Sequence, residues 1–327
     1  MQILGTGEHI PSRHVDSREF DRRWSKEEGW THRQTGVRSR AFIGTDENAV
    51  TMGVCAARQA LDAADIAPAQ LDAIISVSSV PYQLIPCTAV FLQRGLDLQE
   101  SGIAAFDINA TCLGFIVALD LVAQGLATGR YRTVLIVASE PASIGVDWDD
   151  PTTAGLFGDG AGAVVVGVSR HDQAALRASH MATFSAGVEY CQIRAGGTAR
   201  YPRIACGDIL DGTAFEMRGR SIYKLAAERF PPFVDALLHF GSTGRDDVDL
   251  WIPHQASGYA LAHMQALMQV PVDRMMLTLE TVGNQVSASL PIALHRAVSS
   301  GRIGPGSRVV LLGTGAGVSF GGAILDC

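Results

Sequence analysis

The sequence predicts an α/β fold built from two related halves, and two observations support this prediction. Short apolar runs that read as buried strands alternate with helical segments along the 327 residues. The same order also occurs twice: residues 106–140 and 275–312 each contain a polar loop, an apolar helix, a Gly-Arg turn and a buried strand. In this alignment Asn284 takes the place of Cys112, 172 residues later, and His254 that of Val77, 177 residues later. We therefore expect two domains, residues 1–170 and 171–327.

In the first half, we expect strands at residues 2–6, 71–79 and 134–139, because each is a mostly apolar run of suitable length. Apolar spacing predicts helices over 52–64, 88–94 and 113–126. The segment 157–167 (FGDGAGAVVVG) reads as a glycine-rich turn that leads into another strand.

The second half repeats these elements. A helix over 220–240 leads into residues 248–257 (VDLWIPHQAS), which mirror 71–79, and residues 313–325 (GTGAGVSFGGAIL) mirror 157–167. Proline in a helix interior removes a hydrogen bond and clashes with the preceding turn. Because of Pro291, we expect the helix after Asn284 to begin nearer Ser289.

Composition excludes several classes of protein. The net charge of −7 argues against a general nucleic-acid binder. The six cysteines have no CxxC spacing, so neither a zinc site nor a dithiol motif is indicated. With no signal peptide and no apolar run of membrane-spanning length, we expect a cytoplasmic protein that does not insert into membranes. Outside Cys112 we expect structural thiols, namely Cys55, Cys87, Cys191, Cys206 and Cys327. The glycine run 313–317 lacks the acidic residue of a dinucleotide site, and no permanently bound cofactor is expected.

Cys112 lies where an almost wholly apolar helix should begin. Asn109 and Thr111 precede it, and either could accept hydrogen bonds from the first helical N–H groups. The positive end of the helix dipole favours a thiolate at this place. A buried structural cysteine is the alternative.

The predicted halves bring three polar side chains toward one cavity. Cys112, His254 and Asn284 would each follow a strand end of two related parallel sheets. A thiolate exchanges readily with a thioester, so Cys112 could accept an acyl group. The backbone N–H groups of Cys112 and Ala316 could form the oxyanion hole. His254 and Asn284 could donate N–H groups to a second oxyanion, such as the enolate of a decarboxylating malonyl thioester.

The chain resembles the β-ketoacyl-acyl carrier protein synthase III family of the thiolase-like superfamily. The resemblance rests on motifs in the family's order and spacing: WTHRQTGVRSR (30–40), NATCLGF (109–115), FGDGAGAVVVG, IPHQAS (252–257), VGNQVSASLP (282–291) and GTGAGVSFGGAIL. It implies a thiolase-like fold with duplicated βαβαβαββ halves in a five-layered αβαβα sandwich. It also implies a homodimer that condenses an acyl thioester, delivered by coenzyme A, with malonyl-acyl carrier protein.

The resemblance also implies site residues. Cys112 matches the nucleophile, and His254 and Asn284 match the decarboxylation pair. Substrate-binding places match Trp30 (adenine and phosphates of coenzyme A), Phe157 and Tyr223 (the thioester channel), Ser257, and Ile85, which would close the acyl pocket of the partner subunit. For Trp30, Phe157 and Tyr223 an ordinary packing role is the alternative.

Several positions depart from the family pattern. Gln34 stands where the family usually has an Arg, and residues 153–155 contain no Arg where the family often has one. Ser257 and Tyr259 replace an Asn and a nearby Arg of the family. The helix after Ser257 has no Lys or Arg to meet an acidic carrier. We therefore expect a specialised homologue with a non-acetyl primer. The alternatives are an acyltransferase or a non-decarboxylating acyl-condensing enzyme of secondary metabolism, and a non-catalytic partner subunit.

Overall fold

The first half forms a five-stranded sheet. The computed structural model describes residues 1–169, 175–201, 203 and 210–327. Parallel pairing joins β4 to both β5 and β6, whereas β7 runs antiparallel to β6 and β1. The order across the sheet is β1 (Gln2–His9), β7 (Gly160–Gly167), β6 (Thr133–Glu140), β4 (Ala73–Ser76) and β5 (Ala104–Asp107). The carboxyl ends of β4, β5 and β6 therefore lie along one edge.

The second half repeats this order in a four-stranded sheet. Its strands are β8 (Ala175–Thr183), β13 (Ser319–Asp326), β12 (Arg308–Gly315) and β11 (Leu250–Pro253). They correspond to β1, β7, β6 and β4, and β11 pairs with β12 in parallel. The counterpart of β5 is reduced to a single parallel bridge between Trp251 and Met275. The predicted duplication is confirmed, with one strand fewer in the second half.

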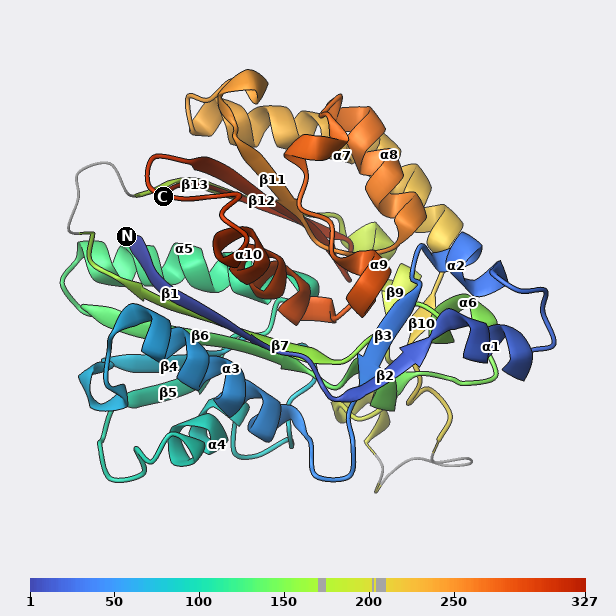
Figure 1. Ribbon diagram of the computed structural model, residues 1–327, viewed down its shortest axis with the longest axis horizontal. Helices are drawn as coiled ribbons and strands as arrows, with labels where there is room; N and C mark the ends of the chain where they lie inside the picture. The colour runs from blue at the N-terminus through green and yellow to red at the C-terminus, as the bar shows by residue number, and fades with distance from the viewer. Residues whose placement is uncertain (170–174, 202, 204–209) are drawn as a thin grey trace.

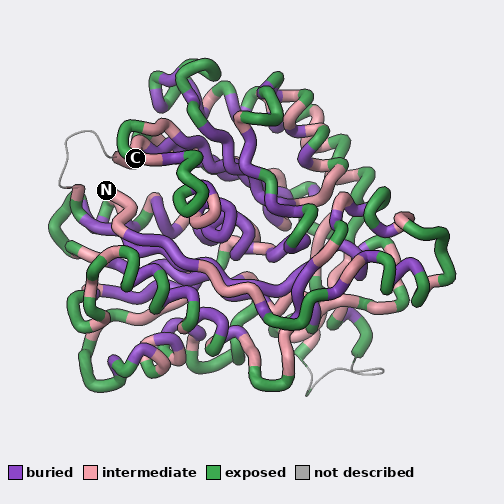
Figure 2. Tube along the Cα trace, viewed as in Figure 1, coloured by how far each residue is buried: buried purple, intermediate pink, exposed green. Residues whose placement is uncertain are grey.

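Helices form three layers around the two sheets (Figure 1). The outer layers are α3 (Ala49–Ala64) with α4 (Thr88–Gly95), and α7 (Gly219–Phe240) with α8 (Gly258–Met268). Between the sheets lie α5 (Gly114–Ala127) and α10 (Ser289–Ser299), whose apolar side chains join both sheets in one core. Figure 2 shows that much of this central layer is buried. The predicted five-layered sandwich is confirmed.

Helix boundaries follow local chemistry. Asn48 Oδ1 accepts the N–H groups of Val50 and Thr51 and so begins α3. As expected, the helix near Pro291 begins at Ser289, so proline falls in its first turn, where no intrahelical N–H partner is lost.

Shorter elements complete the described chain. The pair β2 (Arg13–Asp16) and β3 (Ser39–Phe42) is an antiparallel ribbon that the sequence patterns did not predict. The remaining α-helices and strands of the described residues are α1 (Ser17–Arg23), α2 (Trp30–Thr35), α6 (Pro151–Ala154), α9 (Leu279–Val282), β9 (Cys191–Gln192) and β10 (Glu216–Met217). Across the described residues, none of the helices combines the length and apolarity that a membrane span requires. The domain boundary at 170/171 and Cys206 lie outside the described residues, and the boundary stays a prediction.

Candidate active site

Cys112 lies in a short 3-10 turn, η2 (Thr111–Leu113), directly before α5. Asn109 Oδ1 accepts the backbone N–H of Thr111 at 3.0 Å and so holds the loop before the thiol. The Thr111 hydroxyl does not cap the helix, because it is buried with no hydrogen-bond partner among the described residues. No described side chain caps α5 either, so N–H groups remain at this helix start for an oxyanion.

The Cys112 thiol is neutral in the resting site. Burial raises its pKa, and the nearby Cys191 and Glu140 raise it further. Our expectation that the helix start favours the thiolate was therefore wrong. The helix end favours the thiolate by only about 0.3–1 kcal/mol, and the loss of hydration at this partly exposed thiol outweighs that contribution.

His254 directly follows β11, and its backbone N–H donates to Leu312 O (2.7 Å) on β12. Burial lowers the pKa of the imidazole to about 4, so the ring is neutral at physiological pH. Its Nδ1 lies 2.5 Å from Ser289 Oγ, which also lies 3.0 Å from Val286 O. The hydroxyl donates to Val286 O, so its oxygen can accept Nδ1–H in one tautomer of the ring. In the other tautomer the hydroxyl turns to donate to Nδ1, and the ring carries its proton on Nε2, where it can donate to a ligand.

Asn284 is held by both halves of the molecule. Its backbone N–H donates to Leu156 O (3.0 Å), and its backbone carbonyl accepts the N–H of Gly158 (3.1 Å). In the side chain, Oδ1 accepts the N–H of Val286 (2.8 Å) and Nδ2 donates to Ala256 O (3.1 Å). These two bonds fix which way the carboxamide points. Nδ2 carries a second hydrogen that a ligand can accept.

Around Cys112, the structure pairs the residues of the two halves differently from our sequence alignment. In the structure Asn284 is the counterpart of Asn109, because each Asn accepts the N–H two residues on. Each is then followed by a residue with positive φ, Thr111 at 51° and Val286 at 50°. A 3-10 turn and an apolar helix come next in both halves; the second turn is η8 (Val286–Ala288). The counterpart of Cys112 is therefore Ser287, not Asn284.

Packing brings the three segments together between the two sheets. The turn η2 packs against β12, η8 packs against β6, and the two turns pack against each other. Gly313 marks the contact, because a Cβ built there would lie 2.8 Å from Leu113 Cδ2 and 3.4 Å from His254 Cβ. The segments that carry Cys112, His254 and Asn284 thus lie side by side.

The predicted coenzyme A residues lie on α2 and α8, which meet where Gly36 contacts Gly258. Trp30 is half-buried at the start of α2, and the cation over its ring is Lys26, with Nζ 5.2 Å from the centroid. The arginines near Trp30 in the sequence pair with acids, Arg33 with Glu27 and Arg38 with Glu280. Ser257 caps α8 by accepting the N–H of Ala260 at 3.2 Å.

The other predicted residues occupy different surroundings. Phe157 is buried and packs edge-on against Phe215, with ring centroids 5.0 Å apart. Tyr223 is not a core residue, since it is half-exposed and stacks on His263. Ile85 is 84% exposed in the single chain. Ala316 lies in the turn between β12 and β13.

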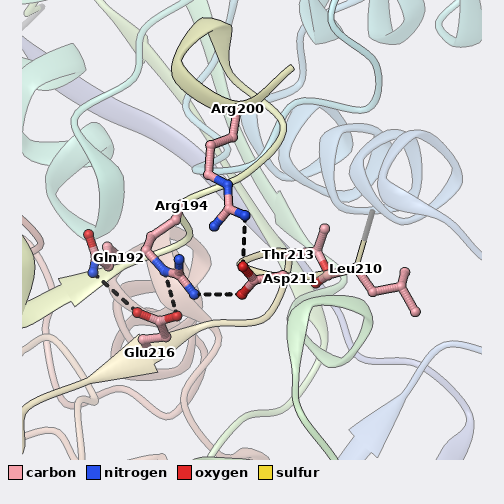
Figure 3. Close-up of polar contacts among 7 residues, drawn as sticks. All are labelled: Gln192, Arg194, Arg200, Leu210, Asp211, Thr213 and Glu216. Carbon is pink, nitrogen blue, oxygen red and sulfur yellow. Dashed lines mark hydrogen bonds and ion pairs between the residues drawn. The ribbon is translucent and has the colours of Figure 1, made fainter. Parts of the chain in front are cut away.

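A segment that the sequence did not connect with the site lies close to Cys112. Cys191 on β9 is near enough to raise the pKa of the Cys112 thiol. Figure 3 shows the ion pairs that hold this segment: Arg194 donates to Glu216 (2.7 Å) and Asp211 (2.9 Å), and Arg200 donates to Asp211 (2.7 Å).

Three buried polar residues of the site were also missed: Glu140, Ser287 and Ser289. A charged residue at the end of an apolar strand is unusual, so Glu140 offered a signal in VLIVASE. Ser287 and Ser289 offered no such signal apart from their place in the motif VGNQVSASLP. Among the described residues no group of three or more His, Cys, Asp or Glu is arranged to hold a metal ion.

Two segments of the chain match family profiles. Residues 106–185 match the profile described as 3-oxoacyl-[acyl-carrier-protein (ACP)] synthase III, and residues 238–327 match its C-terminal counterpart.

Relatives match over almost the whole chain. The β-ketoacyl-[acyl-carrier-protein] synthase III of Methylococcus capsulatus is 36% identical, over 99% of this chain and 98% of the relative. The crystal structure of 3-oxoacyl-[acyl-carrier-protein] synthase III from Aquifex aeolicus superposes with a TM-score of 0.89 at 29% identity, over 100% and 99% of the two chains. The priming β-ketosynthase of the R1128 polyketide pathway gives a TM-score of 0.87 at 29% identity, over 99% and 96%. These matches confirm the thiolase-like fold class.

Proposed function

Because this chain belongs to the β-ketoacyl-acyl carrier protein synthase III family of acyltransferases, we propose that it makes β-ketoacyl thioesters in two half-reactions. The observation that supports the proposal is the packing of the Cys112 turn against β12 and against η8. His254 follows the strand next to β12, and Asn284 lies just before η8. This packing supports a role for Cys112 as the nucleophile and for His254 and Asn284 as N–H donors beside it. No permanently bound cofactor is needed, since acyl-coenzyme A and malonyl-acyl carrier protein are the substrates.

In the first half-reaction Cys112 takes the acyl group. Its sulfur attacks the thioester carbonyl, the carbon–sulfur bond to coenzyme A breaks, and the thiol proton leaves with the departing thiolate. The backbone N–H groups of Cys112 and Ala316 stabilise the tetrahedral oxyanion. Since burial keeps the resting thiol neutral, ionisation accompanies the attack instead of preceding it.

In the second half-reaction His254 and Asn284 stabilise an enolate. The malonyl thioester loses carbon dioxide, and the electron pair of the broken bond forms the enolate, whose oxygen accepts Nε2–H and Nδ2–H. The enolate carbon attacks the acyl group on Cys112, and the expelled thiolate takes up a proton. A neutral imidazole suits this role, and burial keeps the ring neutral.

The primer is a non-acetyl acyl group carried by coenzyme A. Trp30, Ser257, Phe157 and Tyr223 would contact this thioester. In the family an Arg often precedes the FGDGAG motif, but here Thr153 and Ala154 are buried and offer no charge. Exposed basic residues at the start of α7, Arg220 and Lys224, would meet the acidic carrier protein in place of the uncharged helix α8.

The protein acts as a homodimer in the cytoplasm, where thiols stay reduced. The edge strand β5 has one free side, and strands with a free edge are ready to pair with a second copy. Exposed apolar side chains lie in the nearby loop before α4: Val80, Tyr82, Leu84 and Ile85. Ile85 would then close the acyl pocket of the partner subunit.

We expect light scattering to give twice the 34.7 kDa of one chain, and Ala104→Arg, at an exposed position of β5, to give monomers. The charged side chain would block pairing at this edge. Val50→Arg, on the half-buried start of α3, is the control and should stay dimeric. A monomeric wild-type protein would contradict the proposed dimer.

The function is tested with a series of coenzyme A esters from acetyl to dodecanoyl, followed by malonyl-acyl carrier protein. We expect a mass increase on the Cys112 peptide, greatest for a primer longer than acetyl. Release of carbon dioxide and a β-ketoacyl product should follow. If no primer gives carbon dioxide, the proposed decarboxylative condensation is wrong. Transfer of the acyl group to an alcohol or amine would favour an acyltransferase. A Claisen product formed without release of carbon dioxide would favour a non-decarboxylating condensing enzyme.

A further inference from the structure

Glu140 is a buried acid at the end of β6 that the two half-reactions do not use. Because β4, β5 and β6 are parallel, their carboxyl ends share one edge of the sheet. Ser79 follows β4 and Cys112 follows β5 along this edge. Glu140 is only 2% exposed, which is rare for a carboxyl group without a cationic partner.

The carboxyl group of Glu140 joins the two halves of the molecule. Its Oε1 accepts the backbone N–H of Ser79 (2.5 Å) from the first half. The same oxygen accepts the hydroxyl of Ser287 (2.5 Å) from the second half. Ser287 is the structural counterpart of Cys112, so Glu140 fixes the turn that corresponds to the turn of the nucleophile.

A continuous series of hydrogen bonds connects Glu140 with the Cys112 loop. Beyond the N–H of Ser79, the carbonyl of Ser79 accepts Nδ2–H of Asn109 (3.0 Å). Asn109 Oδ1 in turn accepts the N–H of Thr111, the residue before Cys112. Movement of the Glu140 side chain would therefore disturb the nucleophile loop.

On the other side, Glu140 holds the turn of the enolate donors. Ser287 lies three residues after Asn284 and two before Ser289, whose hydroxyl contacts His254. The same carboxyl group thus contacts the segments of both half-reactions.

The charge of Glu140 also affects Cys112. Burial raises the pKa of this carboxyl to about 7, so its charge changes within the working range of pH. The ionised form raises the pKa of the Cys112 thiol. Two titratable groups lie near the Glu140 carboxyl group. One is the Cys112 thiol of η2, and the other is the Cys191 thiol of β9, on the far side of Cys112. The turns at Ser79 and Ser287 contribute only hydroxyl and backbone groups, and His254 lies beyond Ser289.

We propose that Glu140 is a positioning residue whose buried carboxyl group holds the Cys112 loop in register with the Asn284 turn. The proposal rests on the proposed function in taking Cys112 as the nucleophile and Asn284 as a donor to the enolate.

The test removes the negative charge of Glu140 and keeps an oxygen that accepts its hydrogen bonds. In Glu140→Gln, Oε1 can still accept both hydrogen bonds, but the charge is gone. We measure alkylation of the Cys112 peptide by iodoacetamide across pH, using mass spectrometry to separate it from the other thiols. We expect alkylation at pH 8 to be roughly 3- to 10-fold faster than in the wild type, because a like charge has been removed from beside the thiolate. The half-point of the profile should move to lower pH.

The matched control is Asp159→Asn. Asp159 is another buried carboxyl group held by a serine, because it accepts the N–H and hydroxyl of Ser143. The groups that shift the pKa of Cys112 do not include Asp159. This variant should leave the alkylation profile unchanged even if it lowers thermal stability.

The positioning role predicts a second difference. Glu140→Ala removes the acceptor as well as the charge, so kcat for condensation should fall at least about 10-fold while KM for the primer changes little, given the cost of two buried donors left unpaired. Glu140→Gln should retain most of kcat. Equal loss in both variants would contradict the positioning role.

An alkylation profile identical to that of the wild type in folded Glu140→Gln would overturn the electrostatic role. If that variant does not fold, Ser287→Ala replaces it. Loss of the Ser287 hydrogen bond raises the pKa of Glu140 and keeps it neutral to higher pH, so alkylation near pH 8 should again be faster. Since alkylation needs no substrate, it tests this proposal even if no condensation is found.

Discussion

Replacing Cys112 by Ala is expected to abolish the acyl-enzyme and to lower condensation roughly 10³-fold or more, as removal of a covalent nucleophile does in other enzymes. The acyl group has no other acceptor in the mechanism. The measurement is the mass of the protein after incubation with the best primer, together with the rate of β-ketoacyl product formation.

Cys191→Ala is the matched control for this prediction. Cys191 is the neighbouring thiol, and burial raises its pKa to about 11, so it resembles Cys112 in surroundings but does not lie before a helix. This variant should still be acylated on Cys112. If Cys112→Ala still carries the acyl group, or if the group is found on Cys191, Cys112 is not the nucleophile.

Much of the fold could be predicted from apolar patterns. The helix after Cys112 and its counterpart in the second half were expected close to where α5 and α10 lie, because strands and central helices of a layered fold are apolar over their whole length. Pro291 correctly indicated the start of α10. The ribbon of β2 and β3 could not be predicted, since the four residues of each strand show no alternation of apolar and polar side chains.

The site was predicted less completely, because its details depend on backbone conformation and burial. Aligning Asn284 with Cys112 paired the conspicuous residues of each loop. Yet the true correspondence depends on the positive φ of Thr111 and Val286, which neither residue type suggests. Burial likewise reversed the expected ionisation of Cys112, and no local pattern shows that Cys191 lies beside it.

Replacing either donor of the enolate pair is expected to separate the half-reactions. In His254→Ala and in Asn284→Asp, acylation of Cys112 should persist, whereas carbon dioxide release from malonyl-acyl carrier protein should fall about 10²- to 10³-fold, the usual cost of losing one oxyanion donor. Asn284→Asp keeps the acceptor for Val286 N–H but replaces Nδ2–H by an anionic oxygen, which repels the malonyl carboxylate and the enolate. We measure acyl-Cys112 by mass and carbon dioxide with a radiolabelled malonyl group.

Two variants distinguish this effect from general disturbance. His180→Ala removes a histidine that stacks on Phe233 of α7, and Asn48→Asp exchanges one good helix cap for another at α3. Both should release carbon dioxide at nearly the wild-type rate. If His254→Ala and Asn284→Asp instead prevent acylation of Cys112 and leave decarboxylation intact, the two residues serve the thiol, and the enolate must be stabilised by other groups. Equal loss of both half-reactions in a folded variant would also contradict the assignment, because a donor to the enolate has no task until the acyl group is already on sulfur.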